Sequence, residues 1–369
     1  MKLDPLRVLS HRIRFASVLL MPLLLVYILM TFGIFSEWVA PSLDGRTDQH
    51  IAADSTTYIY FADTLREGLA DPFVIGAMTT FPNNFWCPVL LALIIKSTLV
   101  MVFVNYIMAV VSVLLLRETL SVSTWRFLAL LLLNATTTVS LLAVNKEIVD
   151  VLAVSIFLFS YHRRNRILLL LALALALFNR FETCLVMAVF ICLKSRLNPM
   201  RRRRILTIFL LTVGLSILLP LAASKVLAQR FEEASSAGFV NLLDQLEMHY
   251  LYVLAVIPKI LENFFGELLN ISKLSSYSFS DPANSYFLLS NDLASAIVFV
   301  ILALRRKLSL NADIIYFAAI GCIIMAISLV IQPRYFYAFY VLLCLQAAHT
   351  ESSPTSVFSP TRQTEFLHA

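Results

Sequence analysis

Long apolar runs, separated by short clusters of basic residues, follow one another along almost the whole of this sequence. The first run, at about residues 15–36, is long enough for one helix to cross about 30 Å of hydrocarbon. Hydrophobic residues make up 59% of the 369 residues and charged residues 14%, whereas a soluble domain has about 25% charged residues. We therefore predict an all-α polytopic membrane protein.

The basic clusters predict the topology, because lysine and arginine concentrate in cytoplasmic loops. An even number of crossings between clusters yields about 10 transmembrane helices in a single domain, residues 1–349, with both termini cytoplasmic and external loops at 37–85 and 225–285. Residues 350–369, rich in Ser, Thr and Pro, are typical of a disordered tail. The apolar stretch 250–269 is expected to lie in the membrane interface. The predicted helices lie at about 15–36, 85–116, 127–144, 148–161, 167–178, 183–193, 205–224, 287–304, 313–331 and 336–348, with the fifth and sixth meeting at Arg180.

The net charge of +6 does not indicate a nucleic-acid partner, since most of the 29 lysines and arginines fall in the predicted cytoplasmic loops and most of the 23 acids outside them. The basic loop Arg201–Arg204 is better explained as an orientation signal that contacts membrane lipids. The five cysteines show no paired or metal-binding spacing. Asp44 and Asp48 would more readily belong to a solvated loop than to a metal site. No cofactor is predicted, and a divalent metal stays an open alternative.

A polar, carboxylate-bearing segment, residues 52–69, follows the first apolar run. Its apolar residues recur at helical spacing, which predicts an external juxtamembrane amphipathic helix that begins near Asp54. A carboxylate in that position can cap the helix, or it can serve as a general base at the mouth of a cavity. We predict that Asp54 is the catalytic base, with capping as the alternative.

Three predicted helices between residues 148 and 193 are short. Their apolar parts of about 11–14 residues rise roughly 17–21 Å, against a hydrocarbon core of about 30 Å. Charges at that depth cost roughly 2.5–3.5 kcal/mol each, so they should face a wet recess and pair with one another. The alternative is that they extend to the interface from helix ends. The residues expected to line the recess are Asn145, Lys146, Glu147, Asp150, Asn179, Arg180 and Glu182. Of these, all but Asp150 and Asn179 are predicted to bind substrate.

The segment Gln332-Pro333-Arg334-Tyr335 lies where a predicted helix ends on the external side. Pro333 breaks the helix, and an arginine suits a phosphate because its planar fork binds two oxygens. Together with Lys146 and Arg180, Arg334 would offer three cations on an otherwise acidic face. We therefore predict that Arg334 and Tyr335 bind an anionic, lipid-attached substrate. An arginine that reaches the lipid headgroups is the alternative.

The sequence Ala53-Asp54-Ser55-Thr56-Thr57-Tyr58, directly after the first predicted helix, resembles the opening motif of the C-type integral-membrane glycosyltransferases. The protein O-mannosyltransferases and the lipid A aminoarabinose transferases belong to that superfamily. The resemblance implies that Asp54 activates the acceptor hydroxyl, that Tyr58 belongs to the substrate site, and that Lys146 or Arg180 and the late pair Arg334-Tyr335 serve the donor. Two departures are that Ser55 stands where many members have a second acid, which puts metal use in doubt, and that no soluble external domain follows.

The resemblance implies transfer of a sugar or oligosaccharide from a polyprenyl-phosphate-type carrier to a glycan or glycolipid acceptor. The process would be surface-polysaccharide or glycolipid biosynthesis at the bacterial inner membrane. The chain also resembles the bacterial polysaccharide repeat-unit polymerases, which use the same type of donor. A lipid-linked glycan transporter or flippase is the rival from another class. The absence of repeated halves and the concentration of charge on one side argue against it.

Overall fold

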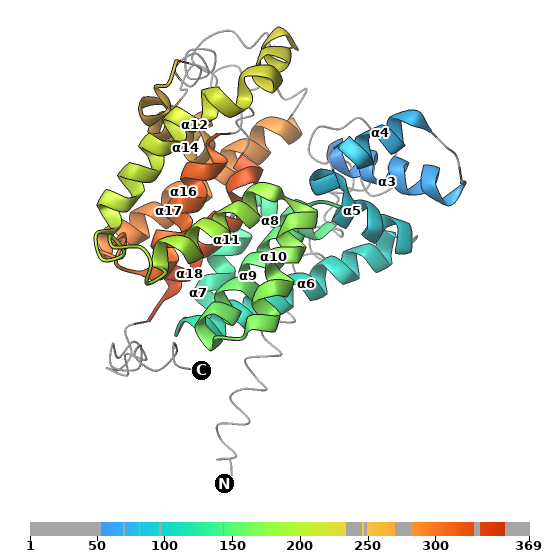
Figure 1. The fold of residues 1–369 in the computed structure, drawn as a ribbon. Coiled ribbons are helices and arrows are strands. Elements are labelled where there is room, and N and C mark those ends of the chain that lie inside the picture. Colours follow the sequence, from blue (N-terminus) through green and yellow to red (C-terminus); the bar gives the residue numbers. More distant parts are fainter. Residues whose placement is uncertain are drawn as a thin grey trace, which may run out of the picture.

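The computed structural model describes residues 53–68, 71–80, 82–95, 98–142, 144–233, 246, 249–269, 282–327 and 333–350. Within these ranges the chain is helical, with one isolated antiparallel bridge between Val122 and His349 (Figure 1). The all-α prediction is confirmed for this part of the chain. The helices are α3 (Ala53–Arg66), α4 (Pro72–Thr80), α5 (Pro82–Ile94), α6 (Thr98–Thr119), α7 (Thr124–Leu132), α8 (Ala135–Leu142), α9 (Glu147–Arg163), α10 (Arg166–Asn179), α11 (Phe181–Lys194), α12 (Arg204–Glu233), α14 (Tyr252–Leu269), α16 (Pro282–Leu304), α17 (Asp313–Met325), the 3-10 helix η1 (Pro333–Phe336) and α18 (Tyr337–Ala348).

The basic clusters between the helices gather at one end of the bundle. Arg163, the last residue of α9, pairs with Glu118 of α6 at 3.4 Å. Asp313, at the start of α17, accepts from Lys194 at 2.9 Å and from Arg204 at 2.6 Å. Backbone hydrogen bonds join the end of α18 to the connection between α6 and α7 at the same end. We call this the basic end. The loops that meet here are those that the charge pattern predicted to lie on the same side of the membrane.

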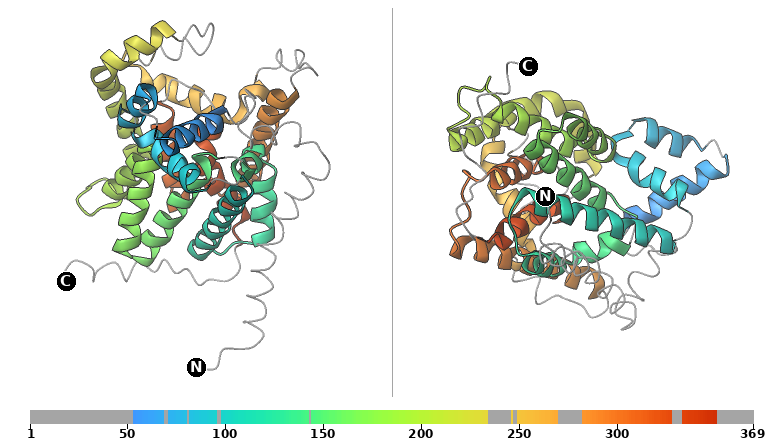
Figure 2. Two further views of the ribbon diagram at one scale, coloured as in Figure 1. Left: turned by 90° about the vertical axis from the view of Figure 1, so that its right-hand side faces the viewer. Right: turned by 90° about the horizontal axis from the view of Figure 1, so that it is seen from below.

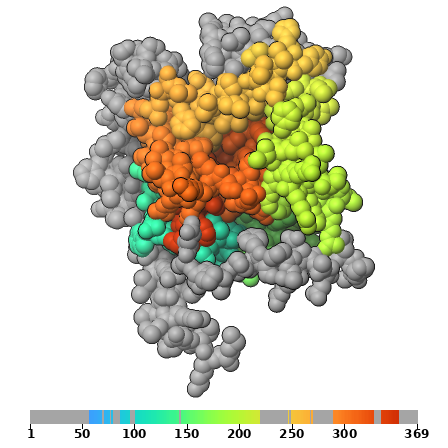
Figure 3. All heavy atoms as spheres, turned by 90° about the vertical axis from the view of Figure 1, so that its left-hand side faces the viewer, coloured from blue at the N-terminus to red at the C-terminus, as the bar shows by residue number. Residues whose placement is uncertain are grey.

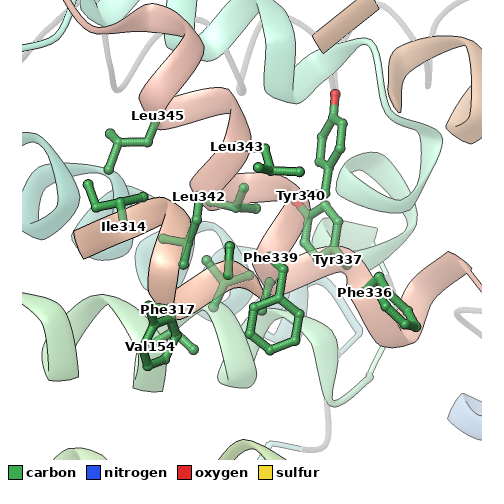
Figure 4. Close-up of a cluster of buried hydrophobic side chains, with 14 of the residues drawn as sticks. Val154, Ile314, Phe317, Phe336, Tyr337, Phe339, Tyr340, Leu342, Leu343 and Leu345 are labelled. Atoms are coloured by element: carbon green, nitrogen blue, oxygen red, sulfur yellow. The ribbon is translucent and has the colours of Figure 1, made fainter. Parts of the chain in front are cut away.

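Helix α18 forms the centre of the bundle. Every residue from Tyr337 to Ala348 is buried, and the helix packs against α7, α9, α16 and α17. Figure 4 shows its aromatic and leucine side chains meeting Phe317 and Ile314 of α17 and Val154 of α9. A helix that is apolar on all sides can be stable only when other helices surround it, so α18 holds the other helices together.

Gly321 of α17 allows α17 and α18 to approach closely. A Cβ atom at this position would overlap the ring of Phe339, which is fully buried in α18. The replacement Gly321→Ala is therefore expected to destabilise the protein by about 1–3 kcal/mol through overpacking. Thermal unfolding in detergent measures the effect. Gly214→Ala is the control, because a Cβ atom there meets no other atom, and equal unfolding temperatures for the two variants would contradict the prediction.

Two helices that the hydropathy pattern predicted are each divided in the structure. The predicted helix from about residue 85 to Arg117 is α5 and α6, so a single helix was wrong. Arg66 of α3 donates to the carbonyl oxygens of Ala92 and Leu93, with 3.0 Å between its Nη2 atom and the Leu93 oxygen. These bonds satisfy carbonyl groups at the end of α5, where a helix leaves its last acceptors unpaired.

The predicted helix at 127–144 is α7 and α8, with a break at Asn134. The Asn134 side-chain oxygen accepts from the backbone nitrogen of Thr136 at 2.9 Å, which caps a new helix. Elsewhere the agreement is closer. The predicted meeting of two helices at Arg180 is confirmed, and the stretch at 250–269 forms α14, although its position in the interface stays a prediction.

Helices α3, α4 and α5 form a small unit that projects from one side of the bundle (Figures 1 and 2). Its core contains Tyr58, Phe61 and Ala62 of α3, packed against α4 and α5. The predicted amphipathic helix is thus present as α3, with its apolar face buried by protein. The predicted first helix at 15–36, the residues Asp44 and Asp48, and the predicted tail after Thr350 lie outside the described residues.

Within the described ranges one helix, Val100–Thr119 in α6, is long and apolar enough to cross a membrane by length and composition. Other helices carry large apolar side chains on their outer faces. Exposed fractions reach 79% for Ile167 in α10, 75% for Ile205 in α12 and 80% for Leu304 in α16. Extended apolar surface of this kind indicates contact with a membrane or with a partner protein. The number of crossings stays a prediction.

Candidate functional site

Acidic side chains begin α9 at the end of the helix away from the basic end. Glu147 and Asp150 lie in its first turn, where the unpaired backbone N–H groups and the helix dipole stabilise negative charge. Glu147 is 5% exposed and Asp150 is 1% exposed. Buried carboxylates need partners, and the chain supplies the main one from the junction of the next two helices.

Arg180 lies between α10 and α11 and contacts both acids. Its backbone is extended, which ends one helix and starts the other, and its side chain reaches back to α9. One guanidinium nitrogen is 3.3 Å from Glu147 Oε1, and another is 3.3 Å from Asp150 Oδ2. Thr183, one turn into α11, also donates to Asp150 Oδ2, at 3.0 Å. The four side chains form one buried cluster, which we call the Arg180 cluster.

Asn179 connects the end of α10 to the start of α9. Its side-chain nitrogen donates to the carbonyl oxygen of Lys146 at 3.0 Å, and the same oxygen accepts from the backbone nitrogen of Asp150 at 2.9 Å. Among the described residues, the side-chain oxygen of Asn179 and the Oδ1 atom of Asp150 are buried and have no hydrogen-bond partner. Buried polar atoms of this kind are rare in folded proteins and call for an explanation.

The late Arg-Tyr pair lies beside the Arg180 cluster. The guanidinium carbon of Arg180 is 5.0 Å from the centre of the Tyr335 ring, and that of Arg334 is 5.8 Å from the same centre. Both distances are within the range of cation–π attraction. Tyr335 therefore links a buried cation to a half-buried one, although the two arginines are far apart in the sequence.

No protein-family model matches this chain, and comparisons with curated proteins and with solved structures also give no match. The resemblance to the C-type glycosyltransferases therefore stays a prediction based on motifs. What the site can do has to be argued from its geometry.

The structure corrects the expectation of an open recess lined by these charges. Arg180 is 3% exposed and Asn179 is fully buried, as the two acids of the cluster nearly are. The physical reason is that Arg180 pairs with both acids at once, so that the charges satisfy one another inside the protein. The expected pairing is present; the expected contact with water is not.

The other predicted residues near the Arg180 cluster are Asn145, Lys146 and Glu182. Asn145 donates to Ser140 and accepts from the backbone nitrogen of Ile148, so it closes the turn between α8 and α9. Lys146 is half-buried next to the cluster, and Glu182 is exposed at the start of α11. Thr183 was missed by the sequence interpretation; its position three residues after Arg180, on the same helical turn, was the only signal.

Helix α3 approaches the site through Val144. Tyr58, which the resemblance placed in the substrate site, is 1% exposed in the core of the α3–α5 unit, and Val144 belongs to the same apolar cluster. Asp54 lies in the first turn of α3, and its side chain is outside the described ones. At the other end of the unit, a 2.8 Å hydrogen bond from the Tyr60 hydroxyl holds the pKa of Asp71 below its usual value.

Among the described residues, no group of three or more His, Cys, Asp or Glu side chains could hold a metal ion. The Arg180 cluster itself contains two carboxylates, and its cation occupies the position that a metal ion would take between them.

Proposed function

We propose that this protein is a polytopic membrane glycosyltransferase, which moves a sugar or oligosaccharide from a polyprenyl-phosphate-type carrier to an acceptor hydroxyl at the external membrane face. The observation that carries the proposal is the arrangement of Arg334, Tyr335 and Arg180 at the end of α9–α11 opposite the basic end. The half-buried cation Arg334 lies near a ring that the buried Arg180 also approaches, which supports a phosphate site there.

The outer surface of the bundle supports the membrane part of the proposal. Large apolar side chains are exposed on α6, α10, α12 and α16, as lipid-facing helices require. The basic end would face the cytoplasm, with both chain termini on that side. A bacterial inner membrane, where polyprenyl carriers serve surface-polysaccharide biosynthesis, is the proposed location.

A hollow gives the proposed lipid carrier a route to this side of the protein. Figure 3 shows it between α12 (yellow-green), α14 (gold) and the orange part of the chain that includes α16, with red C-terminal chain at its floor. Helices α14 and α16 contact η1, which carries Arg334 and Tyr335. We propose that the carrier's hydrocarbon lies along these apolar helices while its phosphate meets Arg334.

The cations have different roles in this proposal. Arg180 is already paired with Glu147 and Asp150, so it supports the Tyr335 ring rather than binding the phosphate directly. Arg334, which also lies near this ring, is half-buried and takes the phosphate, with Lys146 as a second cation near the site. An arginine binds two phosphate oxygens at once and neutralises the charge that develops on the leaving group.

The reaction then needs one base and one leaving group. Asp54 removes the proton from the acceptor hydroxyl. The acceptor oxygen forms a bond to the anomeric carbon, while the bond from that carbon to the carrier phosphate oxygen breaks and its electron pair leaves with the phosphate. A single direct displacement inverts the anomeric centre. Exposed Glu182 could accept hydrogen bonds from sugar hydroxyls.

Donor turnover by the purified protein tests the proposal. The protein in detergent would be given polyprenyl-phosphate and polyprenyl-diphosphate glycans together with candidate glycan acceptors. Arg334→Ala is expected to lower kcat/KM by about tenfold to a hundredfold, because a charge-assisted contact to the phosphate is lost. Arg334→Lys should recover part of the loss, since lysine keeps the charge without the fork.

Arg166→Ala is the matched control, because Arg166 is exposed at the basic end. It should turn over donor at the wild-type rate. A product of many repeats rather than one added unit would identify the repeat-unit polymerase. If the folded protein turned over none of the donors with any acceptor but moved lipid-linked glycan across vesicles, the transferase proposal would be wrong.

A further inference from the structure

The buried Arg180 cluster has an imbalance of charge. One guanidinium faces two carboxylates, those of Glu147 and Asp150. Exposed Glu182 adds a third negative charge that acts on Asp150 from α11. A net negative charge in a site that is at most 5% exposed is costly, because buried charges need partners of opposite sign.

Asp150 also has an unsatisfied oxygen. Its Oδ2 atom accepts from Arg180 and Thr183, whereas Oδ1 is buried and has no hydrogen-bond partner in the described part of the chain. The Asn179 side-chain oxygen, a second acceptor without a donor, lies in the same region, since Asn179 and the Asp150 backbone share the Lys146 carbonyl. The cluster thus lacks one positive charge and one donor at the same place.

We propose that the Arg180 cluster binds one proton, which lies on Oδ1 of Asp150, so that Glu147 alone is the ionised partner of Arg180. A proton at Oδ1 neutralises the excess charge and changes an unsatisfied acceptor into a donor. Because the two carboxyl groups share one cation, the proton belongs to the pair, and its place on Asp150 follows from the deeper burial of that residue.

The groups that face Asp150 from the surrounding helices are consistent with this proton. They are Arg180 at the α10–α11 junction, Glu147 one turn earlier on α9, Thr183 and Glu182 on α11, and the Cys87 thiol on α5. Of these only Arg180 is positive. The proposal does not depend on the glycosyltransferase reaction, and its test needs no substrate.

Infrared difference spectroscopy tests the proposal, because a protonated carboxyl group has a C=O stretching band separate from the bands of carboxylates. Wild-type protein in detergent at neutral pH would be compared with Asp150→Asn, Glu147→Gln, the double variant and Glu118→Gln. Glu118 is the control, because its carboxylate is exposed in an ion pair at the basic end. The unfolding temperature of each variant would be measured in the same detergent.

Asp150→Asn should lose the protonated-carboxyl band and shift the unfolding temperature by less than about 2 °C, because an amide reproduces the acceptor and the donor of the protonated acid. Glu147→Gln should also lose the band, because Asp150 then ionises to pair with Arg180. The double variant leaves Arg180 without either of its buried ion-pair partners. It should unfold lower by more than the sum of the two single shifts, by about 4 °C or more.

Three outcomes would overturn the proposal. One is a spectrum in which Asp150→Asn loses no such band, as expected if a bound cation supplies the missing charge. Another is an Asp150→Asn protein that fails to fold while Glu147→Gln folds, because an ionised Asp150 would then be required. The third is a double variant whose shift equals the sum of the single shifts.

Discussion

Replacing Arg180 with alanine is expected to lower the stability of the folded protein by about 3–5 kcal/mol, the usual cost of removing one partner from a buried ion pair. The variant leaves Glu147 and Asp150 without their shared cation, and both are at most 5% exposed. It also removes the cation that lies over the Tyr335 ring. The stability of Arg180→Lys should fall between that of the wild type and that of Arg180→Ala. Lysine restores the charge but cannot reach both carboxylates with one planar group.

Unfolding in the same detergent, followed by circular dichroism or by a thermal-shift dye, measures the loss. The matched control is Arg163→Ala, which removes an arginine from an exposed ion pair with Glu118 at the other end of α9. That change should cost less than about 1 kcal/mol, because surface ion pairs contribute little. If the two alanine variants unfolded alike, the Arg180 cluster could not be the structural centre of this end of the bundle.

Replacing Asp54 with asparagine is expected to reduce the rate of glycosyl transfer by about 10²–10⁴-fold, which is the usual contribution of a general base. The variant separates the two roles that the sequence left open for Asp54. Asparagine caps a helix about as well as aspartate does, so α3 should remain intact while the base is lost. Measurement of kcat with saturating donor, together with the unfolding temperature, distinguishes loss of chemistry from loss of structure.

Asp63→Asn is the control on the same helix. Asp63 is an exposed acid near the other end of α3, paired with Arg66 at 2.6 Å, and it has no part in the proposed reaction. It should transfer sugar at the wild-type rate. Full activity in Asp54→Asn would show that the carboxylate only caps the helix, and the base would then have to be sought among other acids of the external side.

Local sequence patterns were sufficient for much of the helix assignment. The polar residues around Arg180 interrupt a long apolar run, and charge parity required two helices there; α10 and α11 meet at that residue. The patterns failed where a helix ends for a reason that lies elsewhere in the chain. Helix α5 ends at Ile94, next to the Leu93 carbonyl oxygen that accepts hydrogen bonds from Arg66 of α3.

Local sequence patterns also did not predict how deeply the charged residues are buried. Hydropathy indicated that helices between residues 148 and 193 are short, and from this followed a water-filled recess. In the structure α9 has 17 residues, and the charges that were expected to need water are buried against one another. Whether a charge faces water or a partner depends on which helices are neighbours, and helical periodicity does not contain that information.

The sequence alone determined the features that depend on residues close together in the chain. These are the helical class, the break at Arg180, the amphipathic helix α3 and the distribution of basic loops, because hydropathy, capping and charge act over a few residues. Only the tertiary structure decided that Arg180 pairs with Glu147 and Asp150 and that Arg180 and Arg334 both lie close to the ring of Tyr335. Such contacts form when α9, the α10–α11 junction and η1 pack together. How these distant segments pack depends on the shape and burial of the whole bundle, not on the sequence of any single segment.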